Sequence, residues 1–154
     1  MMTVVEAAPA GSVVIGAQAL NRAAAALDRV QGMKDADIRY SHTFTPGMYA
    51  REMRAPKGSL LISKVHFTTH PFVLSKGKLA LWEDGVGVVD VEAPYSGITK
   101  AGTVRMALVL EDCIWTTFHA TEKTDVMEIE AELGTDPRNL LAGNENLCHS
   151  LPQA

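Results

Sequence analysis

Short runs of alternating apolar and polar residues dominate the chain from about residue 37 onwards. Between Ile114 and Ala120, for example, Trp115, Thr117 and His119 share one face of an extended strand. Turn residues separate the runs, and roughly eight or nine strands at this spacing are typical of a sandwich or barrel. The predicted strands cover residues 38–44, 48–55, 59–67, 72–77, 78–84, 86–93, 104–112 and 113–120.

Two stretches have a helical period instead. From about Ala17 to Met33 the apolar positions recur every three or four residues, and Gly32 provides a stop signal. This alanine-rich stripe is narrow, which suits packing against another helix, a neighbouring subunit or the chain's own barrel. A second helix is predicted up to Leu133, capped by Thr124 or Asp125 and ended by Gly134.

The chain is therefore expected to divide into three parts. Residues 1–36 form an N-terminal arm and helix, residues 37–133 form the barrel with its C-terminal helix, and residues 134–154 form an extended arm. The last part has no clear periodicity but is richer in leucine than a disordered tail needs to be. We therefore expect it to lie on its own barrel or on a partner.

Composition excludes several classes of protein. A chain of 154 residues suits one domain, and its net charge of −4 without a Lys/Arg cluster argues against nucleic-acid binding. No run approaches the roughly 18 apolar residues of a membrane span, and the N-terminus lacks the basic region of a signal peptide. Cys113 and Cys148 are far apart and predict neither a disulfide framework nor a cysteine zinc site.

The spacing of glycine, lysine and histidine between Gly58 and Gly77 is similar to a motif of a known protein family. Gly58 is followed by five residues, Lys64-x-His66, three residues, His70, six residues and Gly77. A second pattern, Lys100-x-Gly102-x-x-Arg105, follows it. Together they resemble the two cupin motifs, and this resemblance implies a jelly-roll barrel. With the helices and tail predicted above, the expected fold is mainly β, a cupin-type jelly-roll barrel with an N-terminal helix and a short C-terminal helix plus extended tail.

The resemblance also implies where a metal would bind. In metal cupins two histidines, a glutamate and a later histidine hold the ion, and the matching positions here are Lys64, His66, His70 and Arg105. Only His66 keeps the family's residue. Protonated lysine and arginine are poor ligands for a divalent ion because they offer no electron pair.

Two interpretations of the barrel mouth stay open. His66, His70 and His119 could converge into a zinc or iron site, or could be histidines hydrogen-bonded within the fold. Arg105 could neutralise a carboxylate such as Glu52, Glu83 or Glu111, or bind an anion. Trp115 could line a pocket or fill the core. The binding candidates are Lys64, His66, His70, Arg105, Trp115 and His119.

More closely, residues 41–133 resemble the small cupin-like proteins of tailed bacteriophages, on the stretches Gly47–Leu81, Val91–Leu108 and Glu111–Leu133. This resemblance implies a viral origin and a protein made in the host bacterial cytoplasm. We therefore expect a non-catalytic virion component, a dimer or trimer that decorates the capsid or attaches to the tail through its terminal arms. The alternatives are a metal- or small-molecule-binding cupin enzyme and a sugar- or anion-binding module.

Overall fold

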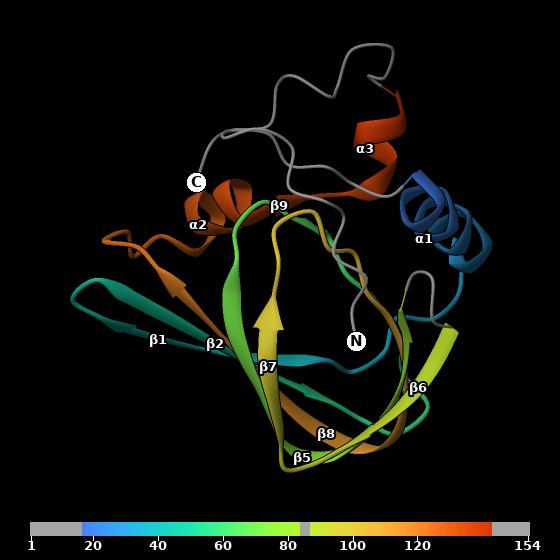
Figure 1. Ribbon diagram of the computed structural model, residues 1–154, viewed down its shortest axis with the longest axis horizontal. Coiled ribbons are helices and arrows are strands. Elements are labelled where there is room, and N and C mark those ends of the chain that lie inside the picture. Colours follow the sequence, from blue (N-terminus) through green and yellow to red (C-terminus); the bar gives the residue numbers. More distant parts are fainter. Residues whose placement is uncertain (1–16, 84–86, 143–154) are drawn as a thin grey trace.

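The computed structural model describes residues 17–83 and 87–142, so residues 1–16 of the expected N-terminal arm and residues 143–154 of the expected C-terminal arm (134–154) lie outside these ranges. Strands predominate, with helices near both ends (Figure 1). The predicted mainly β barrel with an N-terminal and a short C-terminal helix is confirmed. In chain order the elements are α1 (Ala17–Val30), β1 (Arg39–Thr45), β2 (Met48–Ala55), β3 (Leu60–Ile62), β4 (Val65–His66), β5 (His70–Glu83), β6 (Gly87–Glu92), β7 (Tyr95–Thr99), β8 (Met106–Ala120), α2 (Val126–Leu133), β9 (Gly134–Thr135) and α3 (Pro137–Ala142).

Two long strands, β5 and β8, form the centre of an antiparallel sheet. Its strand order is β1-β2-β8-β5-β6, with β3 added beside β8 and β7 added beside β5. The first half of β5 pairs with β7 and its second half pairs with β6. In the same way β8 pairs first with β3 and then with β2. Because each long strand changes neighbours along its length, the sheet curls round on itself (Figure 1).

The curl depends on an irregular stretch of the β5–β8 pairing. The register shifts three times between Leu74 and Leu79. Gly77 lies in this stretch with φ of +90°, a backbone conformation that favours glycine. A Cβ at this position would lie 2.4 Å from the carbonyl oxygen of Asp112 in β8. The bend therefore needs a residue without a side chain, which explains the closing glycine of the sequence pattern.

Two apolar clusters hold the fold together. One fills the curled sheet and contains Leu74, Leu79 and Trp115, so of the two alternatives left open for Trp115 the structure shows a place in the core. The other lies beneath α1 and α3 and joins Leu20 and Leu140 to the barrel, together with Ala19, Ala23, Val65 and Val104. Of the alternatives left open for the alanine-rich helix, the structure shows packing on its own barrel and on α3 (Figure 1).

Four predicted boundaries were wrong. The expected strand pairs 72–77 with 78–84 and 104–112 with 113–120 are single strands, because the chain bends at the bulge without breaking its pairing. The expected strand 59–67 is instead two short strands separated at Ser63 and Lys64. Residues 134–142 are not an extended arm, since they form β9 and α3. The signal for α3 was Asp136 before Pro137, because the Asp136 carboxylate accepts a hydrogen bond from the backbone N–H of Arg138 at 2.8 Å.

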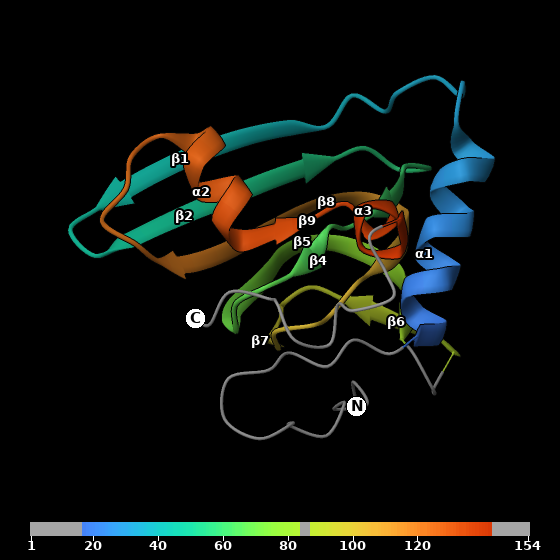
Figure 2. The same cartoon turned by 90° about the horizontal axis from the view of Figure 1, so that it is seen from above.

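The helix α2 begins and ends as predicted. The Asp125 carboxylate accepts a hydrogen bond from the Glu128 backbone N–H at 2.9 Å, and Gly134 follows the last turn. Its one fully buried residue is Ile129. Figure 2 shows α2 lying across the face of β2 and β8. None of the helices in residues 17–83 and 87–142 has the length and apolar character of a membrane span.

We expect Gly77→Ala to lower the free energy of unfolding by about 2–4 kcal/mol, because the new Cβ adds a backbone clash to the strain of a positive φ. The matched control is Gly58→Ala, which has φ of +86° but open space around the new Cβ. It is expected to cost only about 1–2 kcal/mol. Urea unfolding of both variants measures the difference, and equal losses would show that the close approach of β5 to β8 is unimportant.

Candidate functional site

Three histidines from three strands meet on the inner face of the curled sheet. The His70 ring on β5 lies 4.3 Å from the His119 ring on β8 and 4.9 Å from the His66 ring on β4, measured between ring centroids. His70 and His119 are buried, with exposed fractions of 3% and 4%. We call these three side chains the imidazole cluster. The sequence-predicted convergence of the three histidines is thus present.

Local pairing explains why His66 reaches the cluster. Strand β4 pairs with β9, where His66 lies opposite Gly134. A Cβ on Gly134 would approach the Val65 carbonyl oxygen to 2.4 Å, so β9 can lie this close only because residue 134 is glycine. The His66 carbonyl also accepts a hydrogen bond from Gly102 N–H at 2.7 Å. Gly134, identified from sequence only as a helix stop, therefore also positions a histidine.

The hydrogen bonds of the two buried histidines leave one nitrogen of each without a partner. His70 Nδ1 lies 3.0 Å from the Thr68 carbonyl oxygen, and because a carbonyl only accepts, Nδ1 carries the proton. His119 Nε2 lies 3.0 Å from the Thr117 hydroxyl. His70 Nε2 and His119 Nδ1 are buried without any hydrogen-bond partner. Such atoms normally bond to water or to a ligand.

The Arg105 guanidinium lies beside the imidazole cluster and over the faces of two aromatic rings. Its guanidinium carbon is 4.7 Å from the centroid of the Phe72 ring and 5.5 Å from that of Trp115. One guanidinium N–H donates to the Thr99 hydroxyl, and the backbone N–H of Arg105 donates to the Ser63 hydroxyl at 2.8 Å. The side chain is 9% exposed. Cation–π contacts with these two rings help to hold the guanidinium in a fixed orientation.

Burial and positive neighbours keep the imidazoles neutral. Burial lowers the pKa of His70 to about 4, with Arg105 and Arg51 acting in the same direction. Burial also lowers the pKa of His119 to about 3, helped by His70 and Arg51. The pKa of His66 falls well below its ordinary value for the same reason, and His70 and Arg105 add to the effect. Among the described residues, the charges that act on these rings come from histidine and arginine and not from carboxylates.

Among the described residues, a carboxylate lies towards the edge of this arrangement, on α2. Glu130 forms ion pairs with Arg51 at 3.3 Å and with Lys64 at 3.5 Å. Lys64 therefore does not join the cluster: its side chain is half exposed and turned to α2. The strand is interrupted at Ser63 and Lys64, between β3 and β4. Strict alternation along an unbroken strand would have pointed the Lys64 side chain inward, but the interruption removes it.

The sequence analysis missed several residues that line the same face. Tyr49 and Arg51 of β2 lie opposite His119 and Thr117 of β8. The Tyr49 ring stacks 6.0 Å from the His119 ring, and its hydroxyl is 2.7 Å from Nδ1 of His42 on β1. Burial raises the pKa of Tyr49. The alternation of the stretch 48–55 carried this signal, since it puts Tyr49 and Arg51 on one face.

The residues present do not fit the metal that the cupin resemblance implies. Lys64 is exposed, and Arg105 brings a positive charge to the position of the second-motif histidine. Within residues 17–83 and 87–142, no three His, Cys, Asp or Glu side chains are arranged to hold a metal ion, the imidazole cluster included. Two nearby guanidinium groups would also repel a cation.

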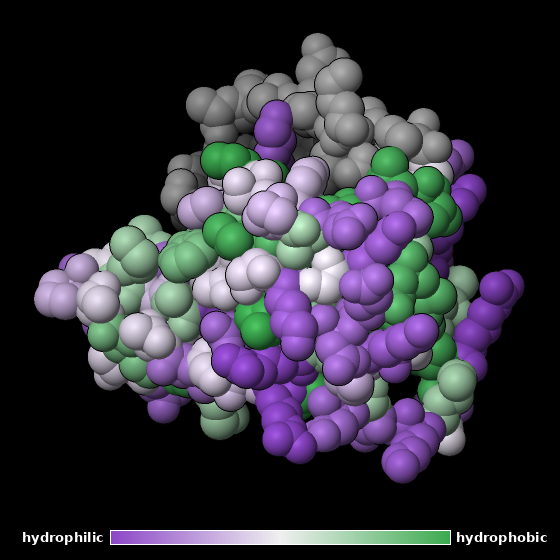
Figure 3. Space-filling model, turned by 90° about the horizontal axis from the view of Figure 1, so that it is seen from below, coloured by the Kyte–Doolittle hydropathy of each residue, from purple (hydrophilic) through white to green (hydrophobic). Residues whose placement is uncertain are grey.

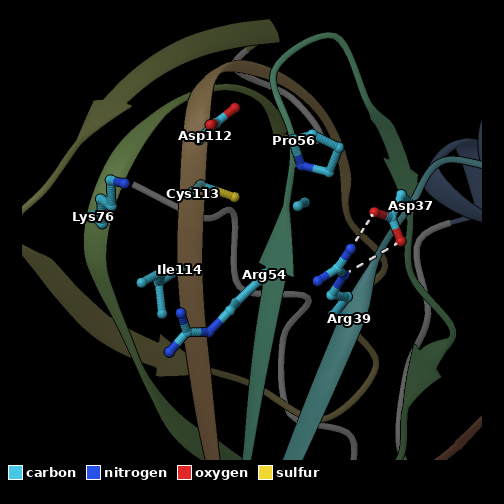
Figure 4. A pocket seen from close by; sticks show the side chains of 9 residues that line it. Asp37, Arg39, Arg54, Pro56, Lys76, Asp112, Cys113 and Ile114 are labelled. Carbon is cyan, nitrogen blue, oxygen red and sulfur yellow. Dashed lines mark hydrogen bonds and ion pairs between the residues drawn. The ribbon is translucent and has the colours of Figure 1, made fainter.

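A separate pocket of about 270 Å³ opens at the bend of the sheet, away from the imidazole cluster (Figure 4). Its cations are largely paired, since Arg39 bonds to Asp37 at 2.9 Å and Arg54 to Glu52 at 2.8 Å. Cys113 on its wall is buried, and burial raises the pKa of its thiol, which disfavours the nucleophilic thiolate. The pocket is lined by Asp37, Arg39, Arg54, Ala55, Pro56, Lys76, Asp112, Cys113 and Ile114.

No protein-family model and no curated protein sequence matches the chain. Among solved structures, it is similar to an acetylacetone dioxygenase from Acinetobacter johnsonii, with 15% identity, a TM-score of 0.48 and coverage of 76% of this chain and 72% of that one. It is also similar to KdgF from Halomonas sp., at 14% identity, a TM-score of 0.48 and coverage of 60% and 87%. A cupin superfamily protein from Desulfitobacterium hafniense matches at 6% identity and a TM-score of 0.47, with coverage of 58% and 82%. Likenesses at this level concern the fold alone.

We expect the free energy of unfolding to fall as the pH is lowered from about 6.5 towards 4. The folded pKa values of His70 and His119 lie below the ordinary value of 6.5, so the unfolded chain binds more protons in this range and acid favours it. Each histidine contributes a slope of up to about 1.4 kcal/mol per pH unit.

Urea unfolding at several pH values measures this slope, and His119→Gln is expected to reduce it by about 1 kcal/mol per pH unit. An unchanged slope in His119→Gln would mean that folding does not lower the pKa of this ring.

Proposed function

We propose that this protein is a small-molecule-binding module of the cupin type whose barrel takes an anionic, hydroxyl-bearing ligand, a small hydroxylated carboxylate. The observation that carries the proposal is the pair of buried, unpartnered nitrogens, His70 Nε2 and His119 Nδ1, beside the buried Arg105. Leaving such polar atoms buried and unpaired costs roughly 1–3 kcal/mol each. A ligand that bonds to them would recover this cost.

The charge of the site favours an anion. Arg105 and Arg51 both act on the imidazole cluster, and among the described residues no carboxylate does so. A carboxylate oxygen placed here would accept charge-assisted hydrogen bonds from a guanidinium, and would face a positive potential in a poorly solvated environment. The planar fork of arginine matches a carboxylate better than a lysine ammonium would.

The protonation of His70 favours a hydroxyl on the same ligand. Because Nδ1 donates to the Thr68 carbonyl, Nε2 of the neutral ring offers a lone pair and accepts a hydrogen bond. A ligand hydroxyl can donate to this nitrogen while the carboxylate lies towards Arg105. The aromatic rings of Phe72 and Trp115 beneath the guanidinium fix its position, so that little conformational freedom is lost on binding.

The virion hypothesis, with capsid or tail proteins as partners, stays a prediction. It depends on two arms, and residues 1–16 and 143–154 lie outside the described residues. The stretch 134–142 instead packs on the chain's own barrel and helps to position His66. The observations at the imidazole cluster support the binding module, which the sequence analysis held as an alternative.

Isothermal titration with three probes tests the proposed ligand class. Glucuronate carries both hydroxyls and a carboxylate, glucose carries only hydroxyls, and acetate carries only the carboxylate. We expect glucuronate to bind measurably at pH 6 and both partial probes to bind at least about tenfold more weakly, since each lacks one set of hydrogen bonds worth about 1.4 kcal/mol or more.

Arg105→Met is expected to weaken glucuronate binding by at least about tenfold, because it keeps an apolar side chain over Phe72 and Trp115 but removes the charge. Lys57→Met, which removes an exposed charge away from the cluster, is the matched control and should leave binding unchanged. Equal binding by wild type and Arg105→Met, or no binding of any anion to the wild type, would contradict the proposal.

Metal analysis of the purified full chain distinguishes the proposed binding module from the alternative of a metal-binding cupin enzyme. The donor set described above leads us to expect substoichiometric zinc and iron. About one ion per chain that is lost in both His66→Ala and His70→Ala would instead support a metal-binding cupin enzyme.

A further inference from the structure

We propose that β1 of one molecule pairs antiparallel with β1 of a second copy, so that two barrels share one continuous sheet. The inference does not depend on the ligand proposed above, because it is argued only from the exposed strand β1. It predicts a twofold dimer centred on His42.

The edge formed by β1 is open. All seven residues of Arg39–Thr45 are exposed, although they form a regular strand. On one side β1 pairs with β2 in an unbroken register from Arg39 opposite Arg54 to Thr45 opposite Met48. Its other edge belongs to no strand pair among the described residues. Figure 2 shows β1 and β2 extending as a hairpin beyond the rest of the barrel.

The strand also lacks the features with which proteins protect an edge. It contains no proline, no lysine and no bulge, and its one charged residue, Arg39, is paired with Asp37 at 2.9 Å. The β6 edge is different, since it carries the exposed acidic residues Asp90 and Glu92. Like charges facing one another would oppose self-pairing at β6, whereas nothing comparable opposes it at β1.

The sequence of β1 is complementary to itself. A twofold axis perpendicular to the sheet leaves each side chain on the same face in both copies. If all seven residues of β1 are paired, a single register is possible, and in it His42 lies opposite His42 of the second copy. Tyr40 then lies opposite Phe44 of the second copy, twice, and Ser41 lies opposite Thr43. Aromatic pairs and hydroxyl pairs of this kind stabilise antiparallel strands. The two arginines lie opposite threonines and do not meet.

The side chains that would be covered are apolar and exposed. Tyr40 is 51% exposed and Phe44 is 37% exposed. Figure 3 shows the projecting hairpin, at the left of the molecule, covered mainly by pale and light green residues of intermediate to hydrophobic character, whereas much of the remaining face is purple and hydrophilic. A second copy of β1 matches both the exposed backbone and these rings, which is why it is the occupant we infer.

The pairing would also extend the wall of the candidate site. His42 at the centre of β1 contacts the Tyr49 hydroxyl, and Tyr49 stacks on His119 of the imidazole cluster. The Arg51 guanidinium lies 5.7 Å from the Tyr40 ring. Phe44 of the second copy would therefore be placed beside the Tyr40 and Arg51 pair, at the rim of the site.

A charge-swap experiment on the full chain tests this register. Ser41 and Thr43 lie on the same face, opposite one another across the proposed axis, and both are exposed. Ser41→Lys with Thr43→Lys puts like charges opposite each other twice, and we expect it to raise the dimer dissociation constant by at least about tenfold. Ser41→Lys with Thr43→Glu puts opposite charges at the same two places and is expected to restore or tighten the dimer.

Native mass spectrometry and analytical ultracentrifugation over a dilution series give the association state. The expected wild-type mass is twice that of one chain. Circular dichroism checks that both double variants are folded, and hydrogen exchange of the β1 amides should show protection that increases with protein concentration.

A wild-type mass of one chain or of three would overturn the proposal. So would a dimer whose dissociation constant is equal in both double variants, because it would use another surface. If the double-lysine variant failed to fold, β1 amide protection in the wild type that did not change with concentration would still overturn it.

Discussion

The close approach of β5 to β8 at Gly77 is the constraint on which the rest of the molecule depends. Because a Cβ on this residue would lie only 2.4 Å from the Asp112 carbonyl oxygen, the two backbones can pass only where there is no side chain. The register shifts beside this glycine let each long strand serve two sets of neighbours. Without that bend, the sheet would stay open, and its inner face would have no enclosed volume in which to bury Trp115 or His119.

Closing the sheet creates an electrostatic problem at the imidazole cluster. The His70 ring lies 4.3 Å and 4.9 Å from its two neighbours, and burial together with nearby positive charge disfavours the protonated forms of all three rings. Burying these imidazoles is unfavourable, and two of their ring nitrogens also lack hydrogen-bond partners. A core optimised only for stability would replace these groups with apolar ones, so their presence indicates a function.

Much of this arrangement could be predicted from the sequence, because alternation alone puts Trp115, Thr117 and His119 on one face and a capping aspartate starts α2. The direction of the Lys64 side chain could not be predicted from the sequence. Motif spacing places it inward, but the short break after β3 turns it towards Glu130, and such a break is set by tertiary contacts. The unpartnered nitrogens were likewise out of reach, since they depend on which atoms Thr68 and Thr117 offer.

The residues at the motif positions change the charge that the barrel interior presents. A metal site presents lone pairs to a cation, and it needs neutral imidazoles and carboxylates to do so. Here the cupin-like spacing is kept, but the glutamate position holds His70 and the late histidine position holds Arg105. His70 removes the negative charge but still offers a lone pair, whereas Arg105 replaces an electron-pair donor with a positive charge. Arg105, with Arg51 nearby, then adds positive charge beside neutral imidazoles, and this charge is the reason for proposing an anion and not a metal ion as the ligand.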